Sequence, residues 1–265
     1  MSSLLRMLGT LCILSMFTSI GLAQTPAEPP IETTVPYEQG RYIIGDRILE
    51  TRIYRKGTGL SYIAPHGDET TSVRAVLAVI EENGGKLVRI VNEGKRLYSF
   101  HLDDVEYTFD PNRIFTDAGV EKVLSKQKGK NEYPRLVHVT IRAFADAMRE
   151  EATAPVFVAL HNNREGGYST KSYLPGGSLQ KEAQKVCHNP DADEDDFFFV
   201  TSQSIFDALC ERRFNVVLQA PSATDDGSLS VYAGQHNIPY VNVEAQRGHL
   251  EIQIVMLLAL LDVLQ

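Results

Sequence analysis

Three residues of the chain have types and a spacing that suit a metal ion. His66 and Glu69 lie three positions apart, and His161 follows far downstream. Two imidazoles and one carboxylate can supply three ligands to zinc and leave its fourth position open for water. Zinc held in this way lowers the pKa of a water to ~7 and polarises a substrate carbonyl. The set therefore predicts a catalytic site with one zinc ion per chain.

A further carboxylate, Glu244, follows an apolar run near the end of the chain. A carboxylate beside such a metal can take a proton from water and pass it to a leaving amine. Each candidate alone has an ordinary explanation: His66 as a loop histidine, and Glu69 as a helix-start carboxylate favoured by the helix dipole. Their coincidence at one place in the fold is what would make a site.

The elements that would position these residues alternate between strands and helices. Three short apolar runs are typical of buried strands, and each leads to a candidate: residues 60–64 to His66, 156–160 to His161 and 240–243 to Glu244. Further strands are expected at 41–54 (a hairpin), 87–91, 197–200 and 215–219, and extended structure around 96–107. Helices are expected from about 70 to 83 and at 117–126, 134–151, 203–212, 229–236 and the C-terminus.

This alternation predicts an α/β domain of three layers (αβα), with a mixed, largely parallel sheet covered on both faces. In such a sheet, ligands bind in the crevice outside the carboxyl ends of the strands. His66, His161 and Glu244 are therefore expected at one rim.

The N-terminus predicts an export signal. Arg6 precedes an apolar run over residues 8–22, and the small Gly21 and Ala23 suit cleavage after Ala23. A membrane anchor is the alternative, but the run is short for a span of ~20 residues and contains Thr and Ser. We expect a signal peptide at 1–23, a disordered, Pro- and Thr-rich leader at 24–39, and one domain at 40–265. The protein would then be periplasmic or secreted, with no stable membrane span after cleavage.

Charge and cysteine content narrow the partners. The formal net charge of −8 disfavours nucleic acid and anionic membranes. Cys187 and Cys210 remain after cleavage, and an exported chain would allow them to pair, although two buried thiols are an equal alternative. The sequence leaves the oligomeric state open.

A polar turn in the middle of the chain offers a group for binding carboxylates. Arg113 follows the neutral amide of Asn112, and an arginine fixed in this way can hold a carboxylate with paired hydrogen bonds. The run from Asp110 through Asn112 is also an ordinary surface turn.

Together, His66-Gly67-Asp68-Glu69, Asn112-Arg113, Leu160-His161 and Glu244 resemble the motifs of the zinc carboxypeptidase superfamily, most closely its succinylglutamate desuccinylase and aspartoacylase branch. The order and rough spacing match from about Leu60 to Glu251. The resemblance implies a zinc peptidase-like (phosphorylase/hydrolase-like) fold, zinc on His66, Glu69 and His161, and Glu244 as general base and acid. It also implies that Asn112 and Arg113 bind the substrate carboxylate.

The resemblance further implies an arginine upstream of the Asn-Arg pair that polarises the scissile carbonyl. Arg96 is the candidate for that role, and Arg89 is the alternative. The family's substrate-binding tyrosine has three possible counterparts: Tyr168, Tyr173 and Tyr232.

The chain also departs from the family. Asn162-Asn163 follow His161 where Ser or Thr is common, and no extra β domain of the aspartoacylase sort follows the last helix. Arg247 and His249 could contact substrate or cap the last helix.

The resulting expectation is an exported, zinc-dependent metallohydrolase of the carboxypeptidase or amidohydrolase type. It would cleave an amide bond next to a free carboxylate, in a small peptide such as one from peptidoglycan or in an N-acyl amino acid. The alternative is a zinc-binding protein on the same scaffold without catalysis, against which Glu244 argues. A serine hydrolase is disfavoured, because Gly177-Ser178 and Gly227-Ser228 are not set in a strand-to-helix elbow.

Overall fold

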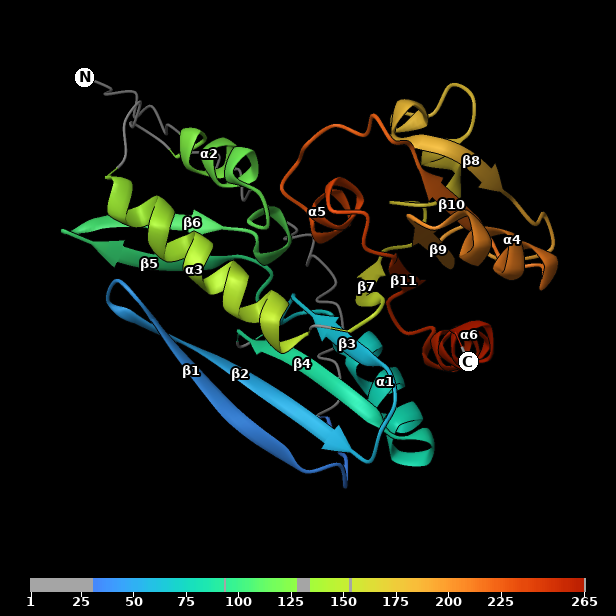
Figure 1. Cartoon of the computed structure of the whole chain (residues 1–265), viewed down its shortest axis with the longest axis horizontal. Coiled ribbons are helices and arrows are strands. Elements are labelled where there is room, and N and C mark those ends of the chain that lie inside the picture. Colours follow the sequence, from blue (N-terminus) through green and yellow to red (C-terminus); the bar gives the residue numbers. More distant parts are fainter. Residues whose placement is uncertain (1–30, 93, 128–133, 153, 265) are drawn as a thin grey trace, which may run out of the picture. The chain divides into compact units, whose positions relative to one another are not determined.

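Four parallel strands form the centre of the sheet: β3 (Ser61–Ala64), β4 (Gly85–Val91), β7 (Phe157–Asn163) and β11 (Tyr240–Gln246). They lie in the order β4-β3-β7-β11, so their carboxyl ends share one edge (Figure 1). The structure is a computed structural model that describes residues 31–92, 94–127, 134–152 and 154–264. The predicted signal peptide and residues 24–30 of the predicted leader lie outside these residues.

Further strands extend the sheet on both sides, through antiparallel pairings except that of β9 with β10, which is parallel. On one side β4 pairs with β2 (Arg47–Lys56), which forms a hairpin with β1 (Tyr37–Ile44). On the other side β11 pairs with β9 (Phe197–Val200), followed by β10 (Val216–Gln219) and β8 (Ala183–Cys187). The predicted α/β class with a mixed, largely parallel central sheet is confirmed. β1 begins at Tyr37, before the Gly40 at which order was expected.

Two layers of helices cover the sheet. One face packs against α1 (Thr70–Asn83), α4 (Gln203–Glu211) and α6 (Leu250–Leu264). The other packs against α2 (Asp117–Ser125), α3 (Arg135–Glu151), α5 (Leu229–Gln235) and the hairpin β5 (Tyr98–Leu102)–β6 (Val105–Phe109). Because side chains alternate along a strand, Val158 and Leu160 of β7 enter the first core and Phe157 and Ala159 the second.

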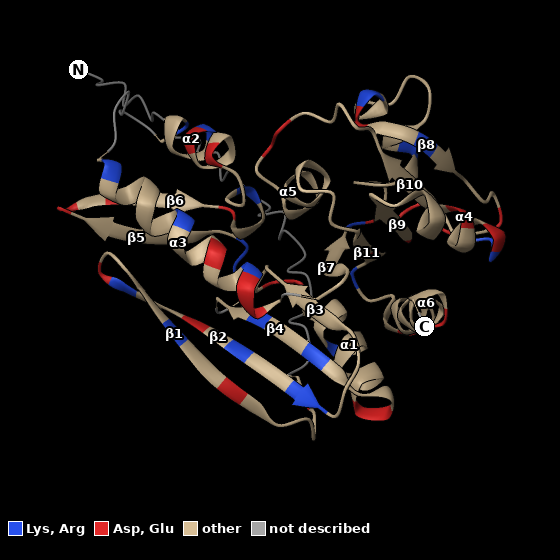
Figure 2. Cartoon of the chain, in the orientation of Figure 1, with Lys and Arg blue, Asp and Glu red and all other residues tan. Residues whose placement is uncertain are grey.

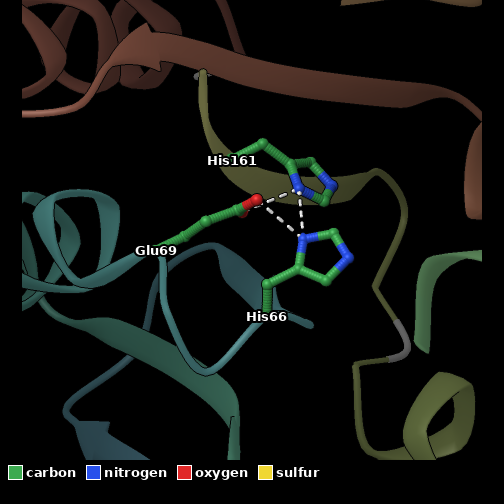
Figure 3. Close-up of side chains that lie close together, drawn as sticks. All are labelled: His66, Glu69 and His161. Atoms are coloured by element: carbon green, nitrogen blue, oxygen red, sulfur yellow. Dashed lines mark hydrogen bonds and ion pairs between the residues drawn. The ribbon is translucent and has the colours of Figure 1, made fainter. Parts of the chain in front are cut away.

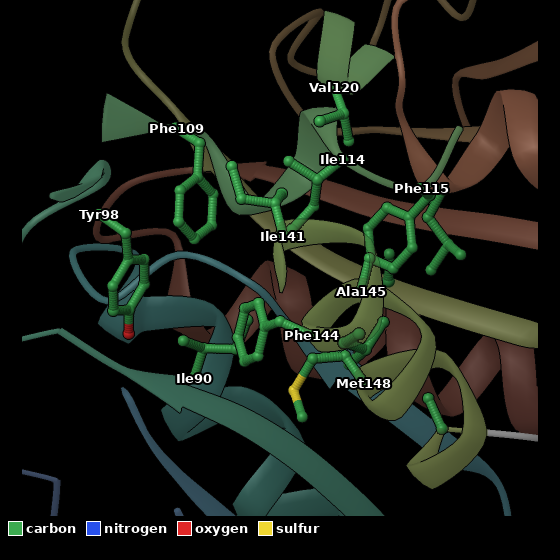
Figure 4. Packing of buried hydrophobic residues seen from close by; sticks show 14 of the residues in the cluster. Ile90, Tyr98, Phe109, Ile114, Phe115, Val120, Ile141, Phe144, Ala145 and Met148 are labelled. Atoms are coloured by element: carbon green, nitrogen blue, oxygen red, sulfur yellow. The ribbon is translucent and has the colours of Figure 1, made fainter. Parts of the chain in front are cut away.

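The second core is rich in aromatic rings. Phe144 of α3 packs edge-on against Phe109 of β6, with ring centroids 6.2 Å apart, and Ile141 and Met148 line the same helix face (Figure 4). Aromatic side chains bury large areas and prefer such tilted arrangements. This core holds the β5–β6 hairpin, and therefore the loop that follows β6, against the sheet.

Two features were not predicted in full. β8 has no continuous apolar run, which explains why this edge strand gives no signal in the sequence. Cys187 at its end forms a disulfide with Cys210 of α4, which decides between the two alternatives for these cysteines.

Charges of both signs are interspersed along the described elements (Figure 2). Within those elements, every helix is too short or too polar to cross a bilayer.

Candidate active site

Three buried side chains converge at the carboxyl edge of the central strands (Figure 3). His66 lies in the turn after β3, Glu69 immediately precedes α1, and His161 is in β7. The Nδ1 atom of His66 is 2.8 Å from Oε1 of Glu69, and Nδ1 of His161 is 3.0 Å from Oε2 of the same carboxylate. The two Nδ1 atoms are 3.2 Å apart. The structure thus brings together the three residues that the sequence singled out as ligands.

The donor set and its spacing fit a zinc ion. A tetrahedral zinc with ligand atoms at ~2.0–2.1 Å places those atoms about 3.3 Å apart. The observed separations of 2.8, 3.0 and 3.2 Å lie within about half an ångström of that value. All three residues are at most 5% exposed, so the strand ends and the first turn of α1 hold them in place.

Asp110 is a site residue whose role the sequence does not predict. Its Oδ1 atom lies 2.8 Å from Nε2 of His66, so the imidazole is held at both nitrogens. Carboxylates on the outer nitrogen orient metal-binding histidines and make them better ligands. Its position in the sequence indicates a site residue, because Asp110 lies directly after β6 in the same turn as Asn112.

Opposite charges set the protonation of this cluster. Burial lowers the pKa of His66, but the neighbouring Glu69 and Asp110 outweigh it and raise that pKa to about 9. Burial opposes ionisation of Glu69, yet His161 and His66 hold its pKa well below the usual range. Burial lowers the pKa of His161. Around neutral pH, His66 is therefore the ligand in its doubly protonated, positively charged form.

This protonation predicts how metal affinity depends on pH. A metal ion must displace the proton of His66, whereas Glu69 is already ionised and His161 already neutral at pH ~7. Glu244 holds a second proton that a nearby cation would help to release. The apparent zinc dissociation constant should fall by about ten- to a hundredfold per pH unit between pH ~7 and ~8.5. Chelator competition at the two pH values measures this, and an unchanged constant would contradict it.

Glu244 stands beside the cluster on the neighbouring strand. In the β7–β11 register it pairs with His161, and it is 4% exposed. Burial, reinforced by the charge of Glu69, raises the pKa of Glu244 to about 8. Asn242 donates from Nδ2 to its Oε2 atom at 3.0 Å. A carboxylate whose pKa lies near the working pH suits proton transfer in both directions.

The positions of Arg96 and Arg89 distinguish between these two candidates for the arginine that polarises the carbonyl. Arg96 donates from Nη1 to Oε1 of Glu69 at 2.7 Å and from Nε to Oδ2 of Asp110 at 3.1 Å. It lines the cavity that contains His161 and Glu244. Arg89 lies within β4 and is not among the residues that line this cavity. Arg96 is the arginine that the fold brings to the cluster.

Asn112 and Arg113 form a short 3-10 turn (η1, Pro111–Arg113) at the same cavity. The amide of Asn112 is fixed on both sides: Leu229 donates its backbone N–H to Oδ1 at 3.2 Å, and Nδ2 lies 3.3 Å from Nε2 of His161. Arg113 donates to the carbonyl of Asn112 and pairs with Asp226 at 3.5 Å. A partly exposed guanidinium thus faces the cavity next to the cluster.

The cavity measures about 670 Å³ and runs from the cluster across the face of β11 and β9. Tyr168 and Tyr173 line it and share a hydrogen bond between their hydroxyls, whereas Tyr232 stacks on His236 outside the lining. Arg247 also lines it and donates to the carbonyl of Asp68. His249 instead contacts Asp196.

Gln253 is the one amide residue in the apolar helix α6, and its hydrogen bonds account for its buried position. Gln253 of α6 is 0% exposed and donates to the carbonyls of His161 and Val243. Its Oε1 accepts from Nδ2 of Asn162 at 3.0 Å. Asn162 thereby ties β7 to α6 and, through its Oδ1, to the N–H of Ser72 in α1.

Replacing Gln253 by the similarly shaped Met should lower the free energy of unfolding by about 1–3 kcal/mol, because buried partners lose their hydrogen bonds. Urea denaturation measures the change. Gln184→Met on the exposed edge strand β8 is the control, for which a change within about 0.5 kcal/mol is expected. Equal stability of the two variants would contradict the role of this network.

No protein-family model matches the chain, and no curated protein sequence matches it. Among solved structures, a candidate metallopeptidase from Shewanella baltica OS155 is similar over 86% of this chain and 84% of its own, with 12% identity and a TM-score of 0.40. One from Shewanella denitrificans OS217 gives 12% identity, the same TM-score of 0.40, and coverage of 86% and 82%.

A metallo-carboxypeptidase from Pseudomonas aeruginosa, solved with (2-guanidinoethylmercapto)succinic acid, is similar over 82% of this chain and 60% of its own. The identity is 10% and the TM-score 0.40.

Proposed function

We propose that the protein is a zinc-dependent hydrolase of the zinc carboxypeptidase superfamily that cleaves an amide bond next to a free carboxylate. The observation that carries the proposal is the convergence of His66, Glu69 and His161, with Glu244 beside His161. A zinc ion on the three ligands would supply a Lewis acid that polarises the carbonyl and activates a water.

The chain's own residues would divide the remaining work. Glu244, with its raised pKa, accepts a proton from the attacking water and delivers it to the leaving amine. Arg96, held over the cluster by Glu69 and Asp110, reaches the place where negative charge develops on the carbonyl oxygen. Arg113 and Asn112 hold the free carboxylate and fix which bond is presented.

The proposed substrates are small peptides and N-acyl amino acids, and the proposed compartment is the cell envelope or the exterior. The compartment rests on the signal-like residues 1–23 together with the disulfide between Cys187 and Cys210, since disulfides persist in oxidising compartments. In a bacterial envelope, peptides derived from peptidoglycan are natural candidates.

The test is turnover of a mixed set of N-acyl amino acids and cell-wall peptides, with and without a chelator. The proposal predicts release of a free amino acid that stops on chelation and resumes on addition of zinc. Zinc binding without turnover of any substrate would favour the non-catalytic zinc protein instead. Hydrolysis that is insensitive to chelators would contradict both.

A further inference from the structure

Two arginines lie side by side on the sheet, outside the lining of the active-site cavity. Arg52 of β2 and Arg89 of β4 are partners in the antiparallel register. Figure 2 shows basic segments of these two strands next to each other. Residues directly opposite each other in such a pair are about 4.5–5.5 Å apart, and like charges there repel. The pair therefore costs stability unless a group of opposite charge binds to it.

Both arginine side chains lie on the face of the sheet that packs against α1. Tyr54 and Leu87 belong to the core on that face, and each arginine lies two positions from one of them on the same strand. Tyr37 of the edge strand β1 pairs with Tyr54 and is 49% exposed. This outer part of the face is therefore open to solvent, and a ligand can approach it.

Arg89 is buried without a carboxylate to pair with. The residue is 8% exposed, and its Nε atom is buried with no hydrogen-bond partner. Burial lowers the pKa of Arg89, the Tyr54 hydroxyl raises it, and the charge of Arg52 lowers it. Among the described residues, no acidic side chain forms an ion pair with Arg89. A buried charge without a partner is costly, so this arrangement points to a ligand.

Arg52 is also placed to bind an anion. Its guanidinium lies over the ring of Tyr37, 4.9 Å from the centroid. The Tyr54 hydroxyl raises the pKa of Arg52, and Glu50 adds a weaker effect without forming an ion pair. A single hydroxyl cannot satisfy the donors of two guanidiniums. Gln39, which pairs with Arg52 from the edge strand, is exposed and adds an amide donor to the same row.

We propose that Arg52 and Arg89 form a binding site for a phosphate group. A phosphate has more oxygens and more negative charge than a carboxylate, so it accepts hydrogen bonds from two guanidiniums at once. A carboxylate is satisfied by a single arginine. Gln39 donates to the phosphate from the open side. The site is separate from the proposed hydrolysis, and the phosphate belongs either to a small phosphorylated molecule or to a lipid headgroup.

The test measures binding of inorganic phosphate by isothermal titration calorimetry at constant ionic strength. We expect a dissociation constant of about 1 mM or below for the wild-type protein. Arg52→Gln and Arg89→Met should each weaken binding by about tenfold or more, because each removes charge-assisted hydrogen bonds. Arg47→Gln is the matched control, since Arg47 lies on the same strand with its side chain on the opposite face. Its affinity should stay within about twofold of wild type.

Thermal unfolding separates a ligand site from a structural arginine. Without phosphate, Arg89→Met should unfold at the wild-type temperature or above, because Met keeps the bulk of the side chain and removes an unpaired charge. Phosphate at a few times its dissociation constant should raise the unfolding temperature of the wild type and of Arg47→Gln more than that of Arg89→Met. A lower unfolding temperature of Arg89→Met together with unchanged phosphate binding would show a structural arginine and overturn the inference.

Vesicles distinguish the two sources of the phosphate. Binding of inorganic phosphate without binding to phosphatidylglycerol vesicles assigns the site to a small molecule. Vesicle binding that Arg52→Gln abolishes assigns it to a lipid headgroup.

Three results overturn the inference: no binding of either probe to the wild type, unchanged affinity in both arginine variants, or phosphate binding that only Arg113→Ala removes. The last result would place the phosphate in the active-site cavity. If Arg89→Met does not fold, Arg52→Gln decides, because Arg52 is only partly buried.

Discussion

Replacing Glu244 by Gln should reduce kcat by about 10²–10⁴-fold and leave the zinc content unchanged. Gln keeps the size of the side chain and an oxygen that can accept from Nδ2 of Asn242, but it cannot take a proton. The three proposed ligands are separate side chains, so the metal site should persist. Steady-state kinetics together with metal analysis of the same preparation measure both effects.

The matched control is Glu121→Gln, an exposed carboxylate on α2. It should retain wild-type kcat. Turnover of Glu244→Gln within a few-fold of wild type would contradict the role of Glu244 in proton transfer. Loss of zinc together with activity would show that Glu244 supports the metal site instead.

Replacing Arg113 by Ala should raise KM for free-acid substrates by about ten- to a hundredfold, because a charge-assisted hydrogen bond to the substrate carboxylate is lost. Substrates whose carboxylate is converted to an amide never form that bond, so their kcat/KM should stay within about twofold of wild type. Asp226, which pairs with Arg113, is partly exposed and can be hydrated when the partner is gone. The fold should therefore tolerate the change.

The comparison of acid and amide substrates makes this test specific. Wild-type protein should prefer the acid, and the variant should lose that preference. Arg212→Ala, at the end of α4, is the control and should keep it. An equal loss of kcat/KM on both substrate types would mean that Arg113 positions other site residues and does not bind the substrate carboxylate.

The sequence was sufficient for the central part of the fold because short, mostly apolar runs mark the central strands, and the run at 156–160 is apolar throughout. Residues 156–160 and 240–243 are short, mostly apolar runs, a pattern typical of buried strands. His161 follows the first run directly, and Glu244 follows the second. Both strands in fact extend through these residues, to Asn163 and Gln246, since polar side chains at the rim still join the ladder. The placement of both residues at one rim followed from strand direction alone.

Other features depend on long-range contacts that leave little trace in a single sequence. Asp110 acquires a role only because the β5–β6 hairpin packs on α3 and places the turn after β6 against His66. Gln253 looks like an interruption of an apolar helix until its amide meets the strand carbonyls. The choice between Arg96 and Arg89 likewise required the folded positions of both side chains, because only Arg96 bonds to Glu69 and Asp110 and lines the cavity.

The zinc content of the purified, folded protein and of its His161→Ala variant tests the proposed metal site directly. We predict about one zinc per chain in the wild-type protein, and loss of that zinc in the variant while the circular dichroism spectrum stays the same. A folded wild-type protein that binds no zinc when zinc is supplied would contradict the proposed metal site. So would a His161→Ala variant that keeps a full equivalent of zinc with unchanged affinity.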